Sequence, residues 1–228
     1  MSRSPESRGK CAYCGETITK RSVSKHLAAC SKRQASLQVA EIATKTPAET
    51  LWHLRVQDAY NKNFWFDLEM RGSSALTQLD NYLRAIWLEC CGHLSEYTIG
   101  GWSGSKVGKG RKADDVFQPG LVLRHLYDFG TTSETDIRVM DAREGKWLSR
   151  HPIALLARNL PPEITCLECD QPAEWLCMEC VIEENKQGYL CQKHADEHDH
   201  HNYGEPIPLV NSPRVGMCGY TGPAEPPY

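Results

Sequence analysis

Residues 166–201 read CLECDQPAEWLCMECVIEENKQGYLCQKHADEHDHH, and this acidic stretch holds five of the eleven cysteines and four of the nine histidines of the chain. Thiolate and imidazole groups at short spacing are the ligands of tetrahedral zinc. Because the pairs supply eight ligands, the stretch predicts a small module built around two zinc ions. The pairs are Cys166 with Cys169, Cys177 with Cys180, Cys191 with His194, and His198 with His200 or His201.

The spacing alone allows two assignments of these ligands. In a sequential arrangement the sets are Cys166, Cys169, Cys177 and Cys180, and Cys191, His194, His198 and His201. In an interleaved arrangement the sets are Cys166, Cys169, Cys191 and His194, and Cys177, Cys180, His198 and His201. His200 and Cys218 compete with His201 for the last position. The order of the pairs, with AEWLCMEC at 173–180 and YLCQKH at 189–194, resembles B-box zinc domains, and this resemblance implies the interleaved arrangement.

A second ligand set lies near the other end of the chain, with the spacing Cys11-x2-Cys14-x11-His26-x3-Cys30. The first pair fits a tight turn, and His26 and Cys30 are four residues apart, so that one face of a short helix can present both. This is the plan of a ββα zinc finger with cysteine as its last ligand, and it raises the expected number of zinc ions to three.

Basic residues surround the expected finger helix: Lys20, Arg21, Lys25, Lys32 and Arg33. Such a cluster is typical of phosphate contacts, and the finger is therefore a candidate contact for nucleic acid. The alternatives are a solvated basic helix and a finger that docks onto a protein. A single finger covers only about three base pairs, which is too few for useful specificity on its own.

Charge is distributed unevenly along the chain, although the net charge is only -3. Residues 1–33 contain eight Lys or Arg and two Glu, whereas residues 161–228 contain twelve acidic and three basic residues. The basic end can meet nucleic acid, and the acidic end is a candidate docking element for a protein partner. The polar start and the lack of an apolar run of ~18 residues predict a cytoplasmic protein without membrane contact, where reduced thiols favour metal over disulfides.

The middle of the chain predicts an α+β domain. Strands are expected at 51–56, 63–70, 93–99, 121–128 and 135–140. Apolar residues recur at helical spacing between the second and third of these strands, at Leu76, Leu79, Leu83, Ile86 and Trp87. Ser73 or Ser74 is expected to cap this helix and Gly92 to end it, and residues 101–112 are expected to form a mobile basic loop.

The sequence predicts no catalytic residue. The string His194-Ala-Asp-Glu-His198 matches inverted zinc proteases, but Cys191 already pairs with His194. Cys90-Cys91-Gly92-His93 could be a fragment of a metal or nucleophile site, although cysteine at a helix end is more often a small core residue. The alternative function is a metal-dependent hydrolase or nuclease that would use His93, Asp114, Asp115 or Asp128 in a central cleft.

Two separated stretches, LRAIWLECCGHLSEY at 83–97 and YDFGTTSET at 127–135, resemble the plasmid pRiA4b ORF-three-like family, whose members also occur as passenger proteins of insertion elements. The resemblance covers roughly residues 50–160, and the segment from Asn211 to Gly222 is similar to longer members. It implies an α+β fold with a curved antiparallel sheet packed by helices, and no established activity. Many members carry an aspartate where this chain has Thr131.

These observations divide the chain into five segments: a CCHC zinc finger at 1–32, a linker at 33–50, the α+β domain at 51–160, a B-box-like two-zinc module at 161–210 and an irregular tail at 211–228. We expect a zinc-binding, non-enzymatic interaction protein that contacts nucleic acid or a protein partner through its zinc modules. In such a modular chain, replacing Cys14 should unfold residues 11–30 and leave the α+β domain intact.

Overall fold

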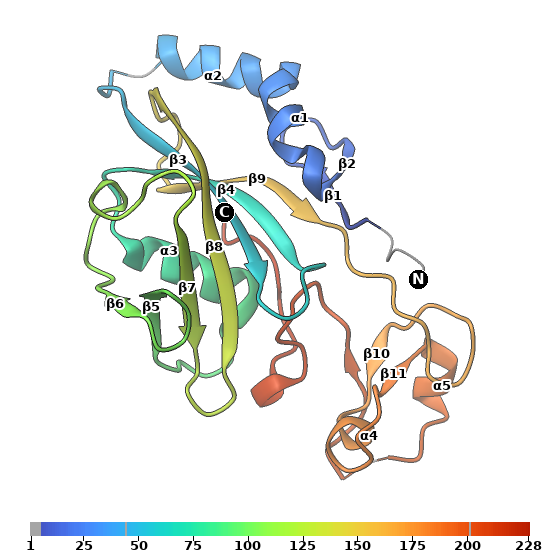
Figure 1. The fold of residues 1–228 in the computed structure, drawn as a ribbon. Helices are drawn as coiled ribbons and strands as arrows, with labels where there is room; N and C mark the ends of the chain where they lie inside the picture. Colours follow the sequence, from blue (N-terminus) through green and yellow to red (C-terminus); the bar gives the residue numbers. More distant parts are fainter. Residues whose placement is uncertain (1–5, 44, 201) are drawn as a thin grey trace.

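The computed structural model describes residues 6–43, 45–200 and 202–228. A nine-stranded antiparallel sheet forms its centre (Figure 1), and a few helices accompany it, which is the expected α+β fold. All five predicted strands are present, and two more, β6 and β9, were not predicted. In sheet order the strands are β2 (Thr17–Thr19), β1 (Arg8–Cys11), β9 (Ile153–Asn159), β4 (Trp65–Arg71), β3 (Glu49–Asp58), β8 (Ser133–Gly145), β7 (Val122–Tyr127), β5 (Ser95–Ile99) and β6 (Ser105–Val107).

One face of the sheet packs against α3 (Leu76–Leu83) and against η2 (Arg84–Leu88), a π-helical turn that continues α3. Alternate residues of a strand point to the same face, and Phe66 and Leu68 of β4 are fully buried on this side. The ring of Trp87 lies 4.5 Å from that of Phe66, so that the end of the helix is anchored in the main core. The predicted apolar face of the helix is therefore confirmed.

The predicted cap of this helix is wrong. The residue before α3 is Ala75, which has no side-chain acceptor, and the hydroxyl of Ser73 donates to Glu49 instead. The first backbone N–H groups of α3 donate to the carbonyl oxygens of Arg111 and Lys109. The basic loop at 101–112 thus satisfies the helix start, and part of the loop forms β6. The helix also ends at Leu88, before Gly92.

The first hairpin belongs to the central sheet. β1 pairs with β2 on one side and with β9 on the other, where Cys11 lies opposite Ala157. The contact is close, because a side chain at Gly9 would collide with the Arg158 carbonyl and with the ring of Trp65. The expected domain boundary at residue 32 stays a prediction. Strands β1 and β2, which precede it, belong to the central sheet. Three helices follow the hairpin: η1 (Lys20–Ser22), α1 (Val23–Ala29) and α2 (Ser31–Ala43), the last lying where the sequence predicts a short helix or a linker.

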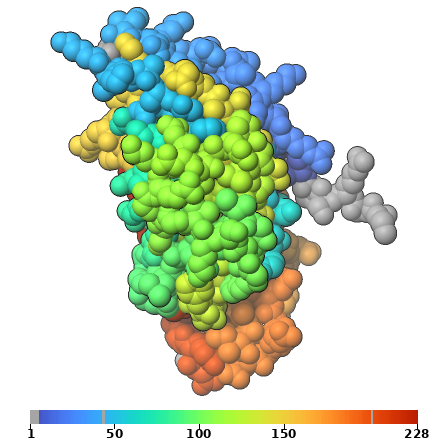
Figure 2. Space-filling view, turned by 60° about the vertical axis from the view of Figure 1, so that its left-hand side comes forward, coloured from blue at the N-terminus to red at the C-terminus, as the bar shows by residue number. Residues whose placement is uncertain are grey.

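The C-terminal module is a separate small unit with a three-stranded sheet of order β11-β10-β12. Figure 2 shows it (orange) at the lower end of the molecule, with residues of the N-terminal segment (blue) at the upper end. Its elements are short: β10 (Trp175–Leu176), α4 (Met178–Ile182), β11 (Tyr189–Leu190), α5 (Gln192–Asp196) and β12 (Ile207–Pro208). Two further short helices, η3 (Ala113–Asp115) and η4 (Met217–Gly219), complete the structure.

The segment after β12, residues 209–228, returns to the central domain and packs against it (Figure 1). Arg214 is completely buried, and its guanidinium lies 2.7 Å from the Asp128 carboxylate. The side chain of Ser212 donates to the carbonyl oxygen of Trp87 at the end of η2. This segment is irregular, as predicted, but its side chains form part of the core. Among residues 6–43, 45–200 and 202–228, no helix has the length and apolar character that crossing a membrane requires.

A buried histidine in the central sheet makes stability depend on pH. Burial lowers the pKa of His125, against the opposing effect of the Asp80 carboxylate, whose Oδ1 lies 2.7 Å from its Nε2. Because His125 is neutral when folded and charges more readily when unfolded, its contribution is present above about pH 6.5 and is lost as the pH falls. We expect His125→Gln, whose amide can still donate to Asp80, to lose less free energy of unfolding than the wild type between pH 7 and pH 5.5.

Urea unfolding at several pH values measures this difference. Protonation of cysteine and histidine metal ligands affects both proteins equally, so the comparison isolates His125. Parallel pH profiles of the two proteins would contradict the expectation.

Candidate metal centres

Four groups of cysteine and histidine each bring four potential ligand atoms within 4.8 Å of one another. Together the groups contain all eleven cysteines of the chain, and every one of these is a free thiol. None is left as a plain core residue. The groups are Cys11, Cys14, His26 and Cys30; Cys166, Cys169, Cys191 and His194; Cys177, Cys180, His198 and His200; and Cys90, Cys91, His93 and Cys218.

The distances between ligand atoms test whether these groups suit zinc. With Zn–S near 2.3 Å and Zn–N near 2.05 Å, a tetrahedral site has S···S edges of about 3.8 Å, S···N edges of about 3.5 Å and N···N edges of about 3.3 Å. Cys169 and Cys191 are 3.9 Å apart at sulfur, His194 Nδ1 lies 3.5 Å from Cys169, and His198 and His200 are 3.1 Å apart at nitrogen. These lengths fit a zinc ion at the centre of each of the two C-terminal groups.

The N-terminal group is assembled by the hairpin and α1. Cys11 ends β1, and Cys14 sits in the following turn, which Gly15 closes with a positive φ of 74°. His26 lies on α1 and turns its Nε2 toward Cys14, 3.4 Å away. Cys30 directly follows α1, where the backbone N–H of Arg33 lowers the pKa of its thiol, despite the opposing effect of burial. The thiolate that zinc requires is therefore favoured at Cys30, whereas burial raises the pKa of the Cys11 thiol.

Two of the five predicted phosphate contacts of the finger point into the molecule. Lys20 donates to Gln57 and to the carbonyl oxygen of Lys62, and burial lowers the pKa of its amine to about 8. Arg33 lies 3.1 Å from the Glu69 carboxylate, which Arg143 also contacts. The remaining three cations are exposed: Arg21, Lys25 and Lys32.

The C-terminal ligands are interleaved. Cys166 and Cys169 meet Cys191 and His194, so the predicted sequential alternative is not formed. Burial raises the pKa of the Cys166 thiol, but the backbone N–H groups of Cys191 and Glu168 outweigh it and bring this pKa to about 6. The group is thus prepared to hold a thiolate.

The other C-terminal group contains Cys177, Cys180, His198 and His200. Burial and the neighbouring Cys177 thiol raise the pKa of Cys180 to about 12, an effect that a cation between the two sulfurs would reverse. His201, the predicted last ligand, lies outside the described residues, and the structure brings His200 to that position. Cys218, the other competitor, lies in a different group.

The residues of the predicted alternative, a hydrolase or nuclease, do not form one site, although His93 lies 3.4 Å from Asp128. Asp114 accepts a hydrogen bond from the Trp52 indole, and Asp128 pairs with Arg214. Within the described ranges, no group of potential ligands includes Asp114 or Asp115. His194 and His198 belong to two different groups, so the string typical of inverted zinc proteases does not form their site.

Sequence reasoning missed the group of Cys90, Cys91, His93 and Cys218. Its first three ligands lie in the four residues 90–93, shortly after η2, while Cys218 lies 125 residues beyond His93. The Cys-Cys-Gly-His string was a local signal, but nothing in the sequence links it to Cys218. Only the packing of the C-terminal segment against η2 brings the fourth ligand to the other three.

No protein-family model matches the chain, and no curated protein matches it. Among solved structures, the chain is similar to a protein of unknown function from Methanosarcina mazei Go1, with 18% sequence identity and a TM-score of 0.39. The match covers 46% of this chain and 66% of that one, slightly less than two thirds of its length.

Proposed function

We propose that this chain is a zinc-binding, non-enzymatic interaction protein that holds one zinc ion in its N-terminal group and two in its C-terminal module. The ligand chemistry carries the proposal, because each group offers four thiol or imidazole ligands. Four such ligands leave no coordination position for water or substrate, which is the character of structural zinc. The eleven free thiols fit a reducing compartment such as the cytoplasm. The resemblances to the pRiA4b ORF-three-like family and to B-box domains remain predictions.

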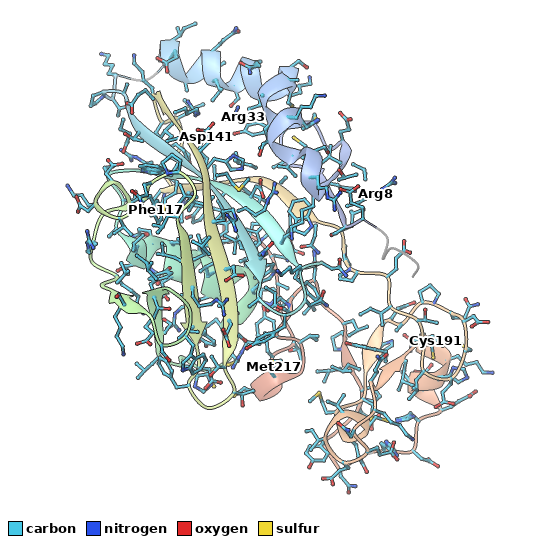
Figure 3. All side chains as sticks on the ribbon, viewed as in Figure 1. Arg8, Arg33, Phe117, Asp141, Cys191 and Met217 are labelled. Atoms are coloured by element: carbon cyan, nitrogen blue, oxygen red, sulfur yellow. The ribbon has the colours of Figure 1, made fainter. Side chains whose placement is uncertain are left out.

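The N-terminal group supports contact with nucleic acid. Arg21, Lys25 and Lys32 are exposed, and the side chain of Arg21 is 91% accessible. Arg8 and Lys10 on β1 are exposed as well, and Figure 3 shows Arg8 directed away from the sheet. Exposed cations around a zinc finger attract phosphate without selecting a sequence.

The C-terminal module supports contact with a protein partner. A cleft of about 1050 Å³ separates it from the central domain, and the exposed residue Glu174 lines this cleft together with the rings of Phe64 and Trp175. Acidic and aromatic groups in one cleft suit a partner segment that carries both basic and apolar side chains.

Titration with a short mixed-sequence DNA duplex tests the nucleic-acid part of the proposal. We expect binding that weakens with salt, and we expect Arg21→Glu, Lys25→Glu and Lys32→Glu together to abolish it. The log–log salt slope should fall by about 0.9 for each cation that neutralises a phosphate. The matched control is Lys106→Glu with Lys112→Glu, which places two charge reversals in the exposed loop of the central domain.

If the finger variant still binds DNA and the control variant does not, the DNA contact lies in the loop of the central domain instead. Absence of salt-dependent binding in the wild type would reject the nucleic-acid contact and leave the cleft as the docking site. Elemental analysis of the same samples gives the zinc content, and fewer than three ions per chain would contradict the structural role of the predicted sites.

A further inference from the structure

The fourth ligand group lies where the C-terminal segment meets the end of η2. Figure 3 places Met217, the residue before Cys218, beside the end of the sheet where the chain turns from β7 into β8. The Sγ atoms of Cys91 and Cys218 are 3.5 Å apart, and those of Cys90 and Cys91 are 3.7 Å apart. His93 Nε2 lies 3.3 Å from the Cys218 sulfur and 2.9 Å from that of Cys91. Both sulfur–sulfur distances lie close to the tetrahedral edge of about 3.8 Å, and both sulfur–nitrogen distances are shorter than the edge of about 3.5 Å.

The backbone on both sides turns so that the ligands converge. Gly92 has a φ of 77°, which reverses the chain between Cys91 and His93 and lets both side chains reach one point. Cys218 itself has a φ of 51°, a left-handed conformation that is unfavourable for a non-glycine residue. This conformation directs the Cys218 sulfur toward the other three ligands, and an ion bound there would offset its cost.

Charged and polar groups surround the Cys90 sulfur. Nη2 of Arg214 lies 3.5 Å from the Cys90 sulfur, and the Tyr127 hydroxyl lies 3.8 Å from it. Three thiolates, one neutral imidazole and a zinc ion carry a net charge of minus one, and the buried guanidinium of Arg214 faces both this charge and the Asp128 carboxylate. Asp128, 3.4 Å from His93 Nε2, is itself held by Arg214 and by the backbone N–H of Gly130.

We propose that Cys90, Cys91, His93 and Cys218 bind a fourth zinc ion, which fastens the C-terminal segment to the end of η2 and exchanges more readily than the other three. Each of the other groups contains two buried cysteines, whereas Cys91 and Cys218 are exposed and the remaining two ligands are half-buried. A chelator therefore reaches this ion first. The inference is independent of the proposed function, which depends on the other three groups.

Zinc analysis of the full-length protein tests this site. We expect four zinc ions per chain in the wild type and three in Cys218→Ser, with Met217→Ala as the matched control that keeps four. Cys91→Ser, which removes the ligand from the other side of the contact, should also leave three. Both cysteines are exposed, so neither substitution creates a cavity in the core.

A chromophoric zinc chelator then measures exchange. In the wild type and in Met217→Ala, one ion should be released in a fast phase that is missing from Cys218→Ser. Amide hydrogen exchange of residues 209–228 should be about tenfold faster in Cys218→Ser, because the segment has lost one of its attachments.

Three results would overturn the inference. One is an unchanged zinc content in both cysteine variants, and another is a fast phase that persists in Cys218→Ser. The third is a wild-type protein that holds only three zinc ions. This result would overturn the inference whether or not mass spectrometry of the unreduced protein finds a disulfide between Cys91 and Cys218. A disulfide between them would require the sulfurs to move from 3.5 Å to about 2.05 Å and an oxidant to accept two electrons.

Discussion

Cys14→Ala is expected to destabilise the central sheet together with the finger, contrary to what independent modules would do. Cys14 is exposed, so its replacement removes a zinc ligand without leaving a cavity. The finger it helps to close contributes β1 to the nine-stranded sheet and covers Trp65, which is fully buried. A structural zinc ion contributes ~10–16 kcal/mol to the folding of finger peptides, so its loss removes the support of this end of the sheet.

We expect the melting temperature of the whole central domain to fall by about 10 °C, which corresponds to about 3 kcal/mol for a chain of this size. Tryptophan fluorescence during thermal unfolding measures the transition, because Trp65 and Trp87 report from the two faces of the sheet. Lys25→Ala, on the same finger and exposed, is the control and should leave the transition unchanged. A central transition that stays in place while residues 11–30 unfold would restore the modular interpretation.

Arg214→Met is expected to cost about 3–5 kcal/mol, because it leaves the Asp128 carboxylate buried without its partner. Arg214 has no exposed surface, and its Nη1 donates to the Ser133 hydroxyl and to the Thr131 carbonyl oxygen. Its guanidinium also lies 4.9 Å from the centre of the Tyr127 ring. One side chain thus connects the C-terminal segment to β7, β8 and the turn between them.

Urea unfolding measures this cost, and a double-mutant cycle separates the ion pair from the other contacts. Arg214→Met combined with Asp128→Asn should cost clearly less than the sum of the single substitutions, because the second change removes the unpaired charge. Additive effects, or a loss below about 1 kcal/mol for Arg214→Met, would show that the segment is not held by this pair.

Local patterns predicted much of the fold. The strands expected at 51–56 and 63–70 and the helical spacing from Leu76 to Trp87 are confirmed, because each pattern lies within a single element. The ligand pairs of the finger and of the C-terminal module were also found from spacing, since two ligands on one turn lie within a few residues. Pairing between the finger hairpin and β9, more than a hundred residues apart, left no such local trace.

The fourth ligand group and the buried Arg214 were not predicted for the same reason. Both depend on a segment without regular structure that folds back onto η2. Its Pro and Gly content indicates irregular backbone, and irregular backbone carries no periodicity from which burial can be inferred. The prediction that Ser73 or Ser74 caps the helix is wrong for another reason. Carbonyl groups of a distant loop accept the hydrogen bonds of the helix start in place of a local side chain.

Because β1 lies inside the central sheet, an unfolded finger would also expose the strand beside it. β9 has β4 on one side and β1 on the other, so loss of the finger would turn β9 into an open edge. That edge would offer unpaired backbone groups beside Leu155 and Leu156, a surface onto which another chain can add a strand. A zinc ion bound in the finger would therefore protect the protein against aggregation, and metal supply during synthesis would then set the yield of dispersed protein.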